Sequence, residues 1–362
     1  MSAMRALLAV AGVLVVLGSV GCSSPAPGTV EVDTHQQGAG PLFSDYASAL
    51  DYAFRSMAQG KSPICMRVMS DGSQIAKKLA RDCVKYAMIT QIRSVAYGNM
   101  VTLHPSYVDD TLLLAVHRGD LPESSLSAAQ RNALRKMQGV VQNIVRRHSG
   151  QYEQALAMHD YIVQTCAYDS EMKVWNQESV TVDLINTHRS VCDGYTRLYH
   201  LMLSLAGMDN KIVLGRGSDN VTHSWNLVCL DGTWTHVDCT YDDPVPDAPG
   251  RVLRNYFGMS DAMIARNHTW VRADYPRASS SSMYYPTTRG LRFKTMEEFL
   301  RYGASYAAAG HKTITAYVQE LDSSHVDAKS RLEKAQAQLR MNLVKILQND
   351  SATPGIIHCH FR

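Results

Sequence analysis

Three residues between positions 190 and 244 have the types and the chain order that thiol chemistry requires: Cys192, His223 and Asp238. A thiol is a weak nucleophile at neutral pH and needs a base to take its proton. The base in turn needs a partner that holds its ring in one orientation. The sequence therefore predicts a nucleophile, a base and an orienting carboxylate, provided that the fold brings the three together.

Cys192 begins an apolar segment with helical spacing, formed by Tyr195, Leu198, Tyr199, Met202 and Leu205. We expect Ser190 to cap this helix, Asp193 to complete a variant of the capping box, and Gly207 to end it. Cys192 then lies in the first turn, where unpaired backbone N–H groups and the helix dipole favour a thiolate. The same N–H groups could form part of an oxyanion hole.

The base and its partner flank Asp231-Gly232, a strong signal for a two-residue hairpin turn. Such a turn pairs His223 with Thr240 and Trp225 with Asp238. His223 and Asp238 then form a diagonal pair on one face, and diagonal neighbours lie about 7–8 Å apart. A slip of one residue would put them on opposite faces, so the predicted site depends on this turn. Trp225 shares the face of His223.

These motifs together resemble the transglutaminase-like superfamily, whose architecture is related to that of papain-like thiol enzymes. The shared pattern is Cys-x-Gly-Tyr at a helix start, His-x-Trp-Asn on a strand, and Val-Asp-x-Thr-Tyr-x-Asp-Pro on the next. The similarity extends from about Ser149 to Trp270. It includes HDYIVQTCAYD before the cysteine and NYFGMSDAMIARNHTW after the aspartate.

The resemblance implies an α+β fold with a papain-like core, in which a helix starting at the cysteine packs on an antiparallel sheet. It implies Cys192 as the nucleophile, His223 as general base and acid, and Asp238 as the residue that orients His223. Family members often carry an aromatic residue or a histidine near Thr181-Val182, where it can assist the oxyanion hole. Val182 departs from that pattern.

Three aromatic residues, Trp175, Trp225 and Tyr241, are the candidates for lining the substrate cleft. His159 and His268 lie in the two outer segments that share the resemblance. For both histidines a structural role, in packing or capping, is favoured over a catalytic one.

Residues 1–21 have the pattern of a secretory signal peptide, with Arg5 followed by the apolar run Ala6–Val16 and then small residues. Cys22 directly after them resembles the lipid-attachment cysteine of a bacterial lipoprotein. The alternatives are a plain signal peptide or an N-terminal membrane anchor. Residues 22–42 are rich in Pro, Gly and polar groups, which is typical of a flexible tether. We expect an exported protein, anchored by lipid to the membrane of the bacterial cell envelope at the outer membrane or cell surface.

The remaining chain is predicted to form a catalytic core between two small α+β modules. The N-terminal flank, residues 43–123, reads as a helix ending at Gly60, a strand, a second helix, and two strands around Asp109-Asp110. The core, residues 124–275, begins with a helix capped by Ser124 or Ser125. The C-terminal module, residues 276–362, reads as helix, strand, a long helix over DAKSRLEKAQAQLRMNLVKILQND, and a last strand, GIIHCHF.

Composition excludes several classes of function. The chain has 362 residues, 45% of them hydrophobic and 19% charged, as in a globular protein. A net charge of +3 is too small to imply nucleic acid. No motif for a nucleotide, cofactor or metal is present, and alternation on a strand puts Cys359 opposite His358 and His360. Six further cysteines could pair in an exported protein or remain buried thiols: Cys65, Cys83, Cys166, Cys229, Cys239 and Cys359.

The predicted chemistry is acyl transfer from a peptide or carboxamide carbonyl through a thioester on Cys192. Water as the acceptor gives a protease or amidase, and an amine gives a transglutaminase; hydrolysis of envelope or extracellular protein is slightly favoured. A cell-wall peptide amidase would use the same residues. The alternative from another class is a non-catalytic module that binds peptide or serves as a scaffold.

Overall fold

The computed structural model describes residues 14–17, 40–83, 88–171, 176, 178–243, 245–247, 251–311, 313–322, 327–339, 344–349 and 355–361. The predicted lipid site at Cys22, most of the predicted signal peptide and Trp175 lie outside these residues. Within them the chain divides into two compact units, which we describe separately. One comprises Ala9–Lys136 with Trp175–Asn186, and the other comprises Met137–Val174 with Thr187–Arg362. The domain boundaries expected from the sequence differ from this division. They divide the chain into consecutive segments, whereas contacts group Trp175–Asn186 with the N-terminal residues.

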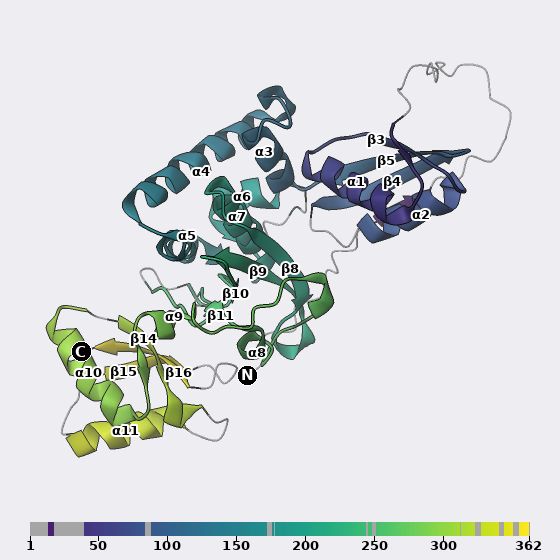
Figure 1. Cartoon of the computed structure of the whole chain (residues 1–362). Helices are drawn as coiled ribbons and strands as arrows, with labels where there is room; N and C mark the ends of the chain where they lie inside the picture. Colours follow the sequence, from purple (N-terminus) through teal and green to yellow (C-terminus); the bar gives the residue numbers. More distant parts are fainter. Residues whose placement is uncertain are drawn as a thin grey trace. The chain divides into compact units, whose positions relative to one another are not determined.

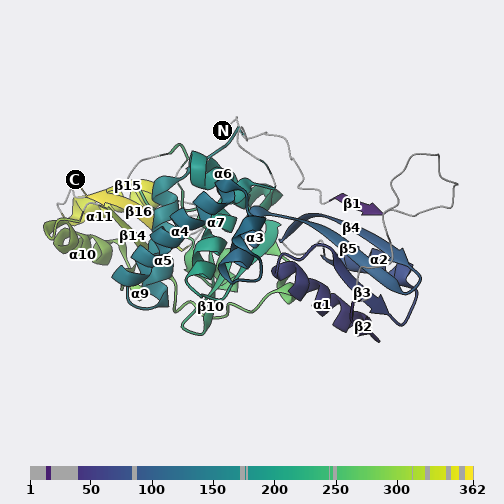
Figure 2. The same cartoon turned by 90° about the horizontal axis from the view of Figure 1, so that it is seen from above.

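The N-terminal unit is a mixed sheet with helices packed on it. Its strand order is β1-β4-β5-β3-β2, and all five strands are labelled in Figure 2. Helices α1 and α2 lie side by side on this sheet and bury Ala53, Met57, Leu79 and Ala80 against it (Figure 1). The elements are β1 (Leu14–Leu17), β2 (Leu42–Phe43), α1 (Tyr46–Ala58), β3 (Ile64–Val68), α2 (Gly72–Cys83), β4 (Ile89–Tyr97), β5 (Met100–Tyr107), α3 (Asp109–His117), the 3₁₀ turn Glu123–Ser125 and α6 (Val180–Thr187).

Of the two strands expected around Asp109-Asp110, the first is β5 and the second is wrong. The chain leaves β5 at Tyr107 and enters helix α3 at Asp109, and β5 pairs with β4, which precedes it. Carboxylates in a first turn favour the positive end of a helix dipole, so this acidic pair starts a helix. Asp109 is fully buried and also accepts hydrogen bonds from the backbone N–H groups of Thr181 and Val182, at 3.3 and 2.7 Å. Thr181-Val182 is thereby engaged in capping α6.

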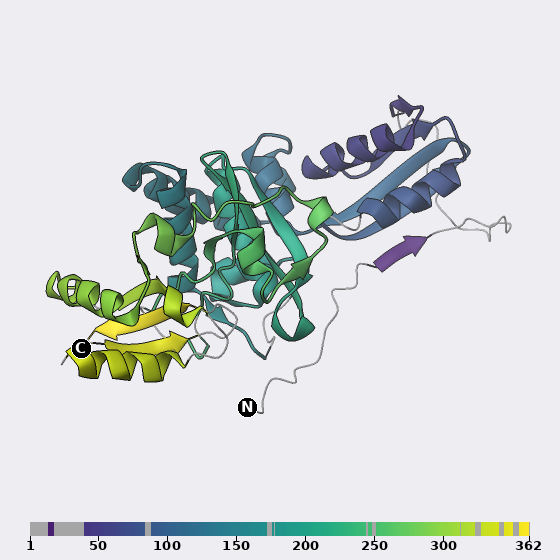
Figure 3. The ribbon, with the colours of Figure 1, turned by 60° about the horizontal axis from the view of Figure 1, so that its bottom comes forward.

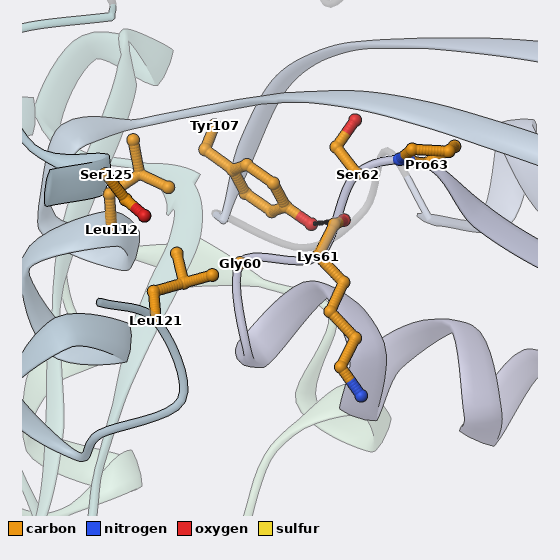
Figure 4. Close-up of a pocket in the computed structure, with 8 residues that line it drawn as sticks. All are labelled: Gly60, Lys61, Ser62, Pro63, Tyr107, Leu112, Leu121 and Ser125. Carbon is orange, nitrogen blue, oxygen red and sulfur yellow. Dashed lines mark hydrogen bonds between the residues drawn. The ribbon is translucent and has the colours of Figure 1, made fainter.

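A surface pocket of about 520 Å³ lies in this unit (Figure 4). It is lined by Gly60, Lys61, Ser62, Pro63, Tyr107, Leu112, Leu121 and Ser125. None of the triad residues predicted from the sequence is among the residues that line it.

The core of the second unit is an antiparallel sheet with strand order β11-β10-β9-β8-β12. Helix α7 packs on β8 and β9, and α5 packs on α7 (Figure 1). The elements are α4 (Ala128–Arg147, which crosses the division between the units), α5 (Gln151–Thr165), β6 (Ala167–Tyr168), β7 (Arg189–Ser190), α7 (Cys192–Leu205), β8 (Asn210–Arg216), the 3₁₀ turn Ser218–Asn220, β9 (Thr222–Leu230), β10 (Thr233–Val237), β11 (Phe257–Met259), α8 (Asp261–Ile264), β12 (Thr269–Trp270), the 3₁₀ turn Arg272–Asp274 and α9 (Tyr285–Thr288).

The hairpin register predicted from Asp231-Gly232 is the one that the structure has. Thr233 pairs with Leu230, and the pairing continues in step to Val237 with Asn226. The ladder ends there, so the expected pairs of His223 with Thr240 and of Trp225 with Asp238 do not form, and Asp238 follows the end of β10. Both turn residues have positive φ, 49° at Asp231 and 79° at Gly232, as a type I′ turn requires.

Two predicted helix caps are wrong. Ser190 lies in β7, and the residue at the N-cap of α7 is Val191, without a side-chain cap. Helix α4 is capped by Ser127, whose hydroxyl accepts from the N–H of Gln130 while Gln130 accepts from the N–H of Ser127. This is a reciprocal capping box. The end of α7 agrees with prediction, because Gly207 follows the helix with φ of 73°.

The C-terminal module has strand order β13-β14-β16-β15, with α10 and α11 packed on the sheet at the yellow end of the ribbon in Figure 3. Its elements are β13 (Arg292–Phe293), α10 (Met296–Ala308), β14 (Thr313–Val318), the 3₁₀ turn Gln319–Leu321, α11 (Ala328–Leu339), β15 (Val344–Asn349) and β16 (Ile356–Phe361). The prediction of one long helix is wrong. The helix ends at Leu339, and Val344–Asn349, which was predicted as its last part, forms β15 and pairs with β16. Pairing with β16 stabilises Val344–Asn349 as a strand although its sequence continues the helical pattern.

The cysteines of the described residues remain thiols, with no disulfide between them: Cys65, Cys83, Cys166, Cys192, Cys229, Cys239 and Cys359. In the same part of the chain, none of the helices combines the length and apolar character needed to cross a bilayer.

A buried charge network fixes the segment that follows Asp238. Both ring nitrogens of His159, on α5, face carboxylates: Nδ1 lies 3.0 Å from Asp160 and Nε2 lies 3.1 Å from Asp242. Arg254 donates to Asp160 as well. Asp242 also accepts from the backbone N–H of Tyr256, whose carbonyl accepts from the N–H of Asp238. The network thus ties helix α5 to the backbone that carries the triad carboxylate.

We predict that this network makes stability fall with rising pH. Burial alone would lower the pKa of His159, but Asp160 and Asp242 outweigh it and raise the pKa to about 8. Since the unfolded pKa is about 6.5, the stabilisation is complete below pH 6.5 and is lost as pH rises through about 8, at a cost of about 2 kcal/mol. Chemical denaturation from pH 6 to 9 measures it. His159→Gln should remove this part of the pH dependence; equal slopes in both proteins would contradict the prediction.

Candidate active site

Cys192 is the first residue of α7 and its side chain is partly exposed. The N–H groups of Gly194 and Tyr195 bond to the carbonyl of Val191, which leaves the amides of Cys192 and Asp193 as the candidates in this turn for binding an oxyanion. The thiol therefore lies at a helix N-terminus where a substrate can approach it.

The helix of Cys192 is bonded directly to the strand of His223. The hydroxyl of Thr196 donates to the carbonyl of Ser224 at 2.9 Å, and the amide of Asn226 donates to the carbonyl of Thr196 at 3.0 Å. These partners lie within four residues of Cys192 and His223 along the chain. They therefore set the spacing between the thiol and the imidazole.

His223 connects the thiol to the carboxylate. Its Nε2 lies 2.7 Å from Oδ2 of Asp238, so Nδ1 is the nitrogen available to the Cys192 thiol, which is a hydrogen-bond partner of this ring. Burial alone would lower the pKa of His223. The charge and hydrogen bond of Asp238, assisted by Cys192, outweigh burial and raise the pKa well above its ordinary value. The ring is thus poised to hold the proton of the thiol.

Asp238 is 1% exposed and uses both carboxylate oxygens. Oδ1 accepts from the backbone N–H groups of Thr240 and Tyr241, at 3.0 and 3.1 Å. Oδ2 accepts from His223 and, at 3.0 Å, from Nε2 of His268. Burial would raise the pKa of Asp238, but the two histidines hold it well below its usual range. The carboxylate is therefore ionised and fixed in orientation.

Of the three cleft candidates, Tyr241 lies at the site. Its ring meets His223 edge-on with centroids 4.9 Å apart, and its hydroxyl accepts from the N–H of Ser218. The expectation that Trp225 lines the cleft is wrong. Its side chain is fully buried and stacks on His223 with ring centroids 5.9 Å apart, so it supports that ring from inside the core. Its indole N–H donates to Nδ1 of His236 at 3.0 Å. Trp175 lies outside the described residues.

Sequence reasoning missed two residues at the site. His268, for which a structural role was favoured, contacts the triad carboxylate directly. Tyr168, on β6, pairs with Ser190 two positions before Cys192. Burial first, and then the charges of Cys192, Tyr241 and Asp238, raise the pKa of Tyr168 to about 12, so its phenol keeps its proton at neutral pH. The signal for both was their place in the outer segments that share the family pattern.

One ligand-type atom from each of His223, Asp238 and His268 lies within 4.8 Å of the other two. A metal there would have to take both imidazoles from Asp238, whose hydrogen bonds they satisfy at 2.7 and 3.0 Å. The donor set thus fits a hydrogen-bonded relay better than a metal site.

Comparison with known proteins identifies the class of domain. Residues 138–239, which contain Cys192, His223 and Asp238, match the family model of the transglutaminase-like superfamily. The chain therefore contains a transglutaminase-like domain of α+β fold, as its motifs predicted, and this superfamily is one of thiol enzymes.

Two curated relatives are the kyphoscoliosis peptidases of Mus musculus and Homo sapiens, each 26% identical over 134 and 133 residues respectively. The matched segment is 33% of this chain, and the chain spans only 20% of the length of each relative. Similar solved structures include the periplasmic domain of TgpA from Pseudomonas aeruginosa, with 16% identity, a TM-score of 0.28, and coverage of 41% of this chain and 57% of that one. Another is a TGase, with 11% identity, a TM-score of 0.28, and coverage of 58% and 61%.

We predict that Cys192 reacts readily with iodoacetamide at pH 6.5, because His223 takes its proton. His223→Ala should slow labelling at pH 6.5 by up to about 100-fold, since an isolated thiol is only about 1% ionised there. Peptide mass spectrometry measures labelling of each cysteine separately.

Cys65 and Cys229 are partly exposed as well and serve as controls within the same molecule. Their labelling should be the same in the unsubstituted protein and in His223→Ala. Labelling of Cys192 that follows theirs, with no effect of His223→Ala, would contradict the predicted ion pair.

Proposed function

We propose that this chain is a cysteine-dependent acyl-transfer enzyme that acts on peptide or carboxamide bonds. The observation that carries the proposal is the triad geometry: a partly exposed thiol at a helix N-terminus, within hydrogen-bond reach of a buried imidazole that Asp238 holds at 2.7 Å. The superfamily match over residues 138–239 supports it.

In the proposed reaction His223 takes the proton of Cys192 and the thiolate attacks the carbonyl carbon, forming a C–S bond. The developing oxyanion rests on backbone N–H groups at the start of α7. His223 then donates its proton to the leaving amine as the C–N bond breaks, which leaves a thioester. Water or an amine attacks the thioester while His223 takes its proton, and the thiolate leaves and recovers a proton.

Tyr168 is the side chain we assign to the oxyanion together with the backbone. Its phenol stays protonated at neutral pH, and it lies partly exposed on β6, opposite Ser190 in the pairing of β6 with β7. A protonated phenol can donate a hydrogen bond to the oxyanion, where negative charge develops only in the transition state.

We favour water over an amine as the acyl acceptor, and so a protease or amidase over a transglutaminase. The curated relatives are named peptidases, which supports this choice. The proposed substrate is a protein or peptide, and the N-terminal signal pattern with Cys22 supports an exported, lipid-anchored enzyme that meets substrates in the cell envelope.

We predict that the full chain cleaves or deamidates denatured casein peptides, with activity reduced by at least about 1,000-fold in Cys192→Ala. Mass spectrometry of the products distinguishes peptide cleavage from deamidation, and monodansylcadaverine supplied as the amine reports transamidation. Amine incorporation exceeding hydrolysis would replace the hydrolase by a transglutaminase. Peptide binding without turnover, equal in both proteins, would favour a non-catalytic module.

We further predict that Tyr168→Phe lowers kcat by about 10- to 100-fold and leaves KM nearly unchanged, because the lost donor acts only in the transition state. The matched control is Cys192 labelling by iodoacetamide, which needs the thiolate but no oxyanion and should be unaffected. A variant with unchanged kcat would remove Tyr168 from the oxyanion site.

A further inference from the structure

His268 lies outside the segment matched by the family model, yet it contacts the triad carboxylate directly. Its Nε2 lies 3.0 Å from Oδ2 of Asp238, the same oxygen that receives Nε2 of His223 at 2.7 Å. The three side chains are 1%, 1% and 7% exposed for His268, Asp238 and His223. Two imidazole N–H groups therefore share one buried carboxylate oxygen with little access of water.

The second nitrogen of His268 is engaged as well. Nδ1 lies 2.7 Å from the side-chain oxygen of Asn267, whose amide nitrogen donates to the hydroxyl of Tyr256 at 2.8 Å. Both ring nitrogens thus face acceptors, a carboxylate on one side and an amide oxygen on the other. An imidazole that donates from both nitrogens is the protonated, positively charged form.

The surroundings of His268 suit a cation. Its ring centroid lies 4.8 Å from Trp225, 4.8 Å from Tyr241 and 5.8 Å from Tyr256, and aromatic faces attract positive charge. Asp238 is the carboxylate that pairs with it, and the ring of His223 is 5.4 Å away.

The neighbouring histidine on β10 has an uncharged ring. His236 accepts the indole N–H of Trp225 at Nδ1, which only a neutral ring can do, and its Nε2 lies 2.8 Å from Asp261. Burial foremost, with the charges of His268 and Arg272 adding to it, lowers the pKa of His236 to about 4, against the pull of Asp261. The neutral ring of His236 thus contrasts with the ring of His268, whose two nitrogens both face acceptors.

We propose that His268 is a positioning residue of the triad: as a second cation on Oδ2 of Asp238, it fixes the carboxylate and limits how strongly Asp238 retains the proton of His223. This inference rests on the proposed function, in which His223 must give that proton to the leaving amine. With His268 in place, one carboxylate charge is divided between two imidazolium rings that also repel each other. Without it, the whole charge acts on His223, which keeps its proton to higher pH and transfers it less readily.

The first test is the protonation state of His268 in the full chain. Histidine labelled with ¹⁵N reports which ring nitrogens carry protons, and the resonances are assigned from His223→Ala and His268→Gln. Two protonated nitrogens on His268 are expected in the folded protein, one for each of its hydrogen bonds to Asp238 and Asn267. A single protonated nitrogen would overturn the charged state and with it the proposal.

The second test measures the titration of His223 after Cys192 is capped with iodoacetamide, so that the thiolate no longer contributes. His268→Gln keeps an N–H donor near the position of Nε2 but removes the charge. The pKa of His223 should rise by about one unit, a tenfold gain in proton affinity. An unchanged or lower pKa would show that His268 only packs against Asp238.

His200→Gln is the matched control, because this residue is a histidine of the same unit whose Nδ1 contacts Asn210 at 2.6 Å. It should leave the titration of His223 unchanged. Should His268→Gln fail to fold, Asn267→Leu removes the acceptor of Nδ1, makes the charged form of His268 less stable and should shift His223 in the same direction.

These readouts do not depend on turnover. If Cys192 is labelled no faster than the control cysteines while the pKa of His223 rises in His268→Gln, the proposed function is rejected and the role of His268 is kept. If Cys192 is labelled rapidly and the pKa of His223 does not change in His268→Gln, the proposed function is kept and the role of His268 is rejected.

Discussion

The hydrogen bonding of one buried carboxylate, Asp238, constrains the structure around it. A charge that is 1% exposed is costly unless donors replace its water, and here two backbone N–H groups and two imidazoles do so. Each donor comes from a different stretch of the chain: β9 carries His223, the turn after β10 supplies the backbone groups, and the residue before β12 is His268. The carboxylate thus requires these segments to meet at one point, and the imidazole beside Cys192 is held as a consequence.

Three histidines of this domain differ in charge because their partners differ. His159 lies between two carboxylates and is a cation, which holds α5 to the segment after Asp238. His236 accepts from an indole and is neutral, which holds Trp225 under the ring of His223. His223 lies between a thiol and a carboxylate, and this is the arrangement that allows a proton to be taken up and returned. Burial alone would make all three neutral; it prevails at His236, whereas the carboxylates outweigh it at His159 and His223.

The parts of the fold that the sequence predicts well are those governed by neighbouring residues. Asp231-Gly232 adopts the positive φ angles of a tight turn, so the register of His223 against Asp238 follows from local geometry. The apolar spacing after Cys192 likewise predicts a helix that ends before Gly207. The errors occur where distant segments compete with local preference. Val344–Asn349 continues a helical pattern but pairs with β16, and Asp109 starts a helix while also capping α6, whose residues lie some seventy positions later.

The sequence by itself determined the order of thiol, imidazole and carboxylate, the helix that begins at Cys192, and the hairpin that puts His223 and Asp238 on one face, because each depends on residue type and short-range spacing. Only the tertiary structure decided which further groups reach those residues. Tyr168 comes opposite Ser190, two positions before Cys192, through the pairing of β6 with β7, and Trp225, expected in the cleft, is buried in the core beneath His223. His268 reaches Asp238 across thirty positions of chain. Spacing alone cannot reveal such contacts, since they form only when separate elements pack together and exclude water.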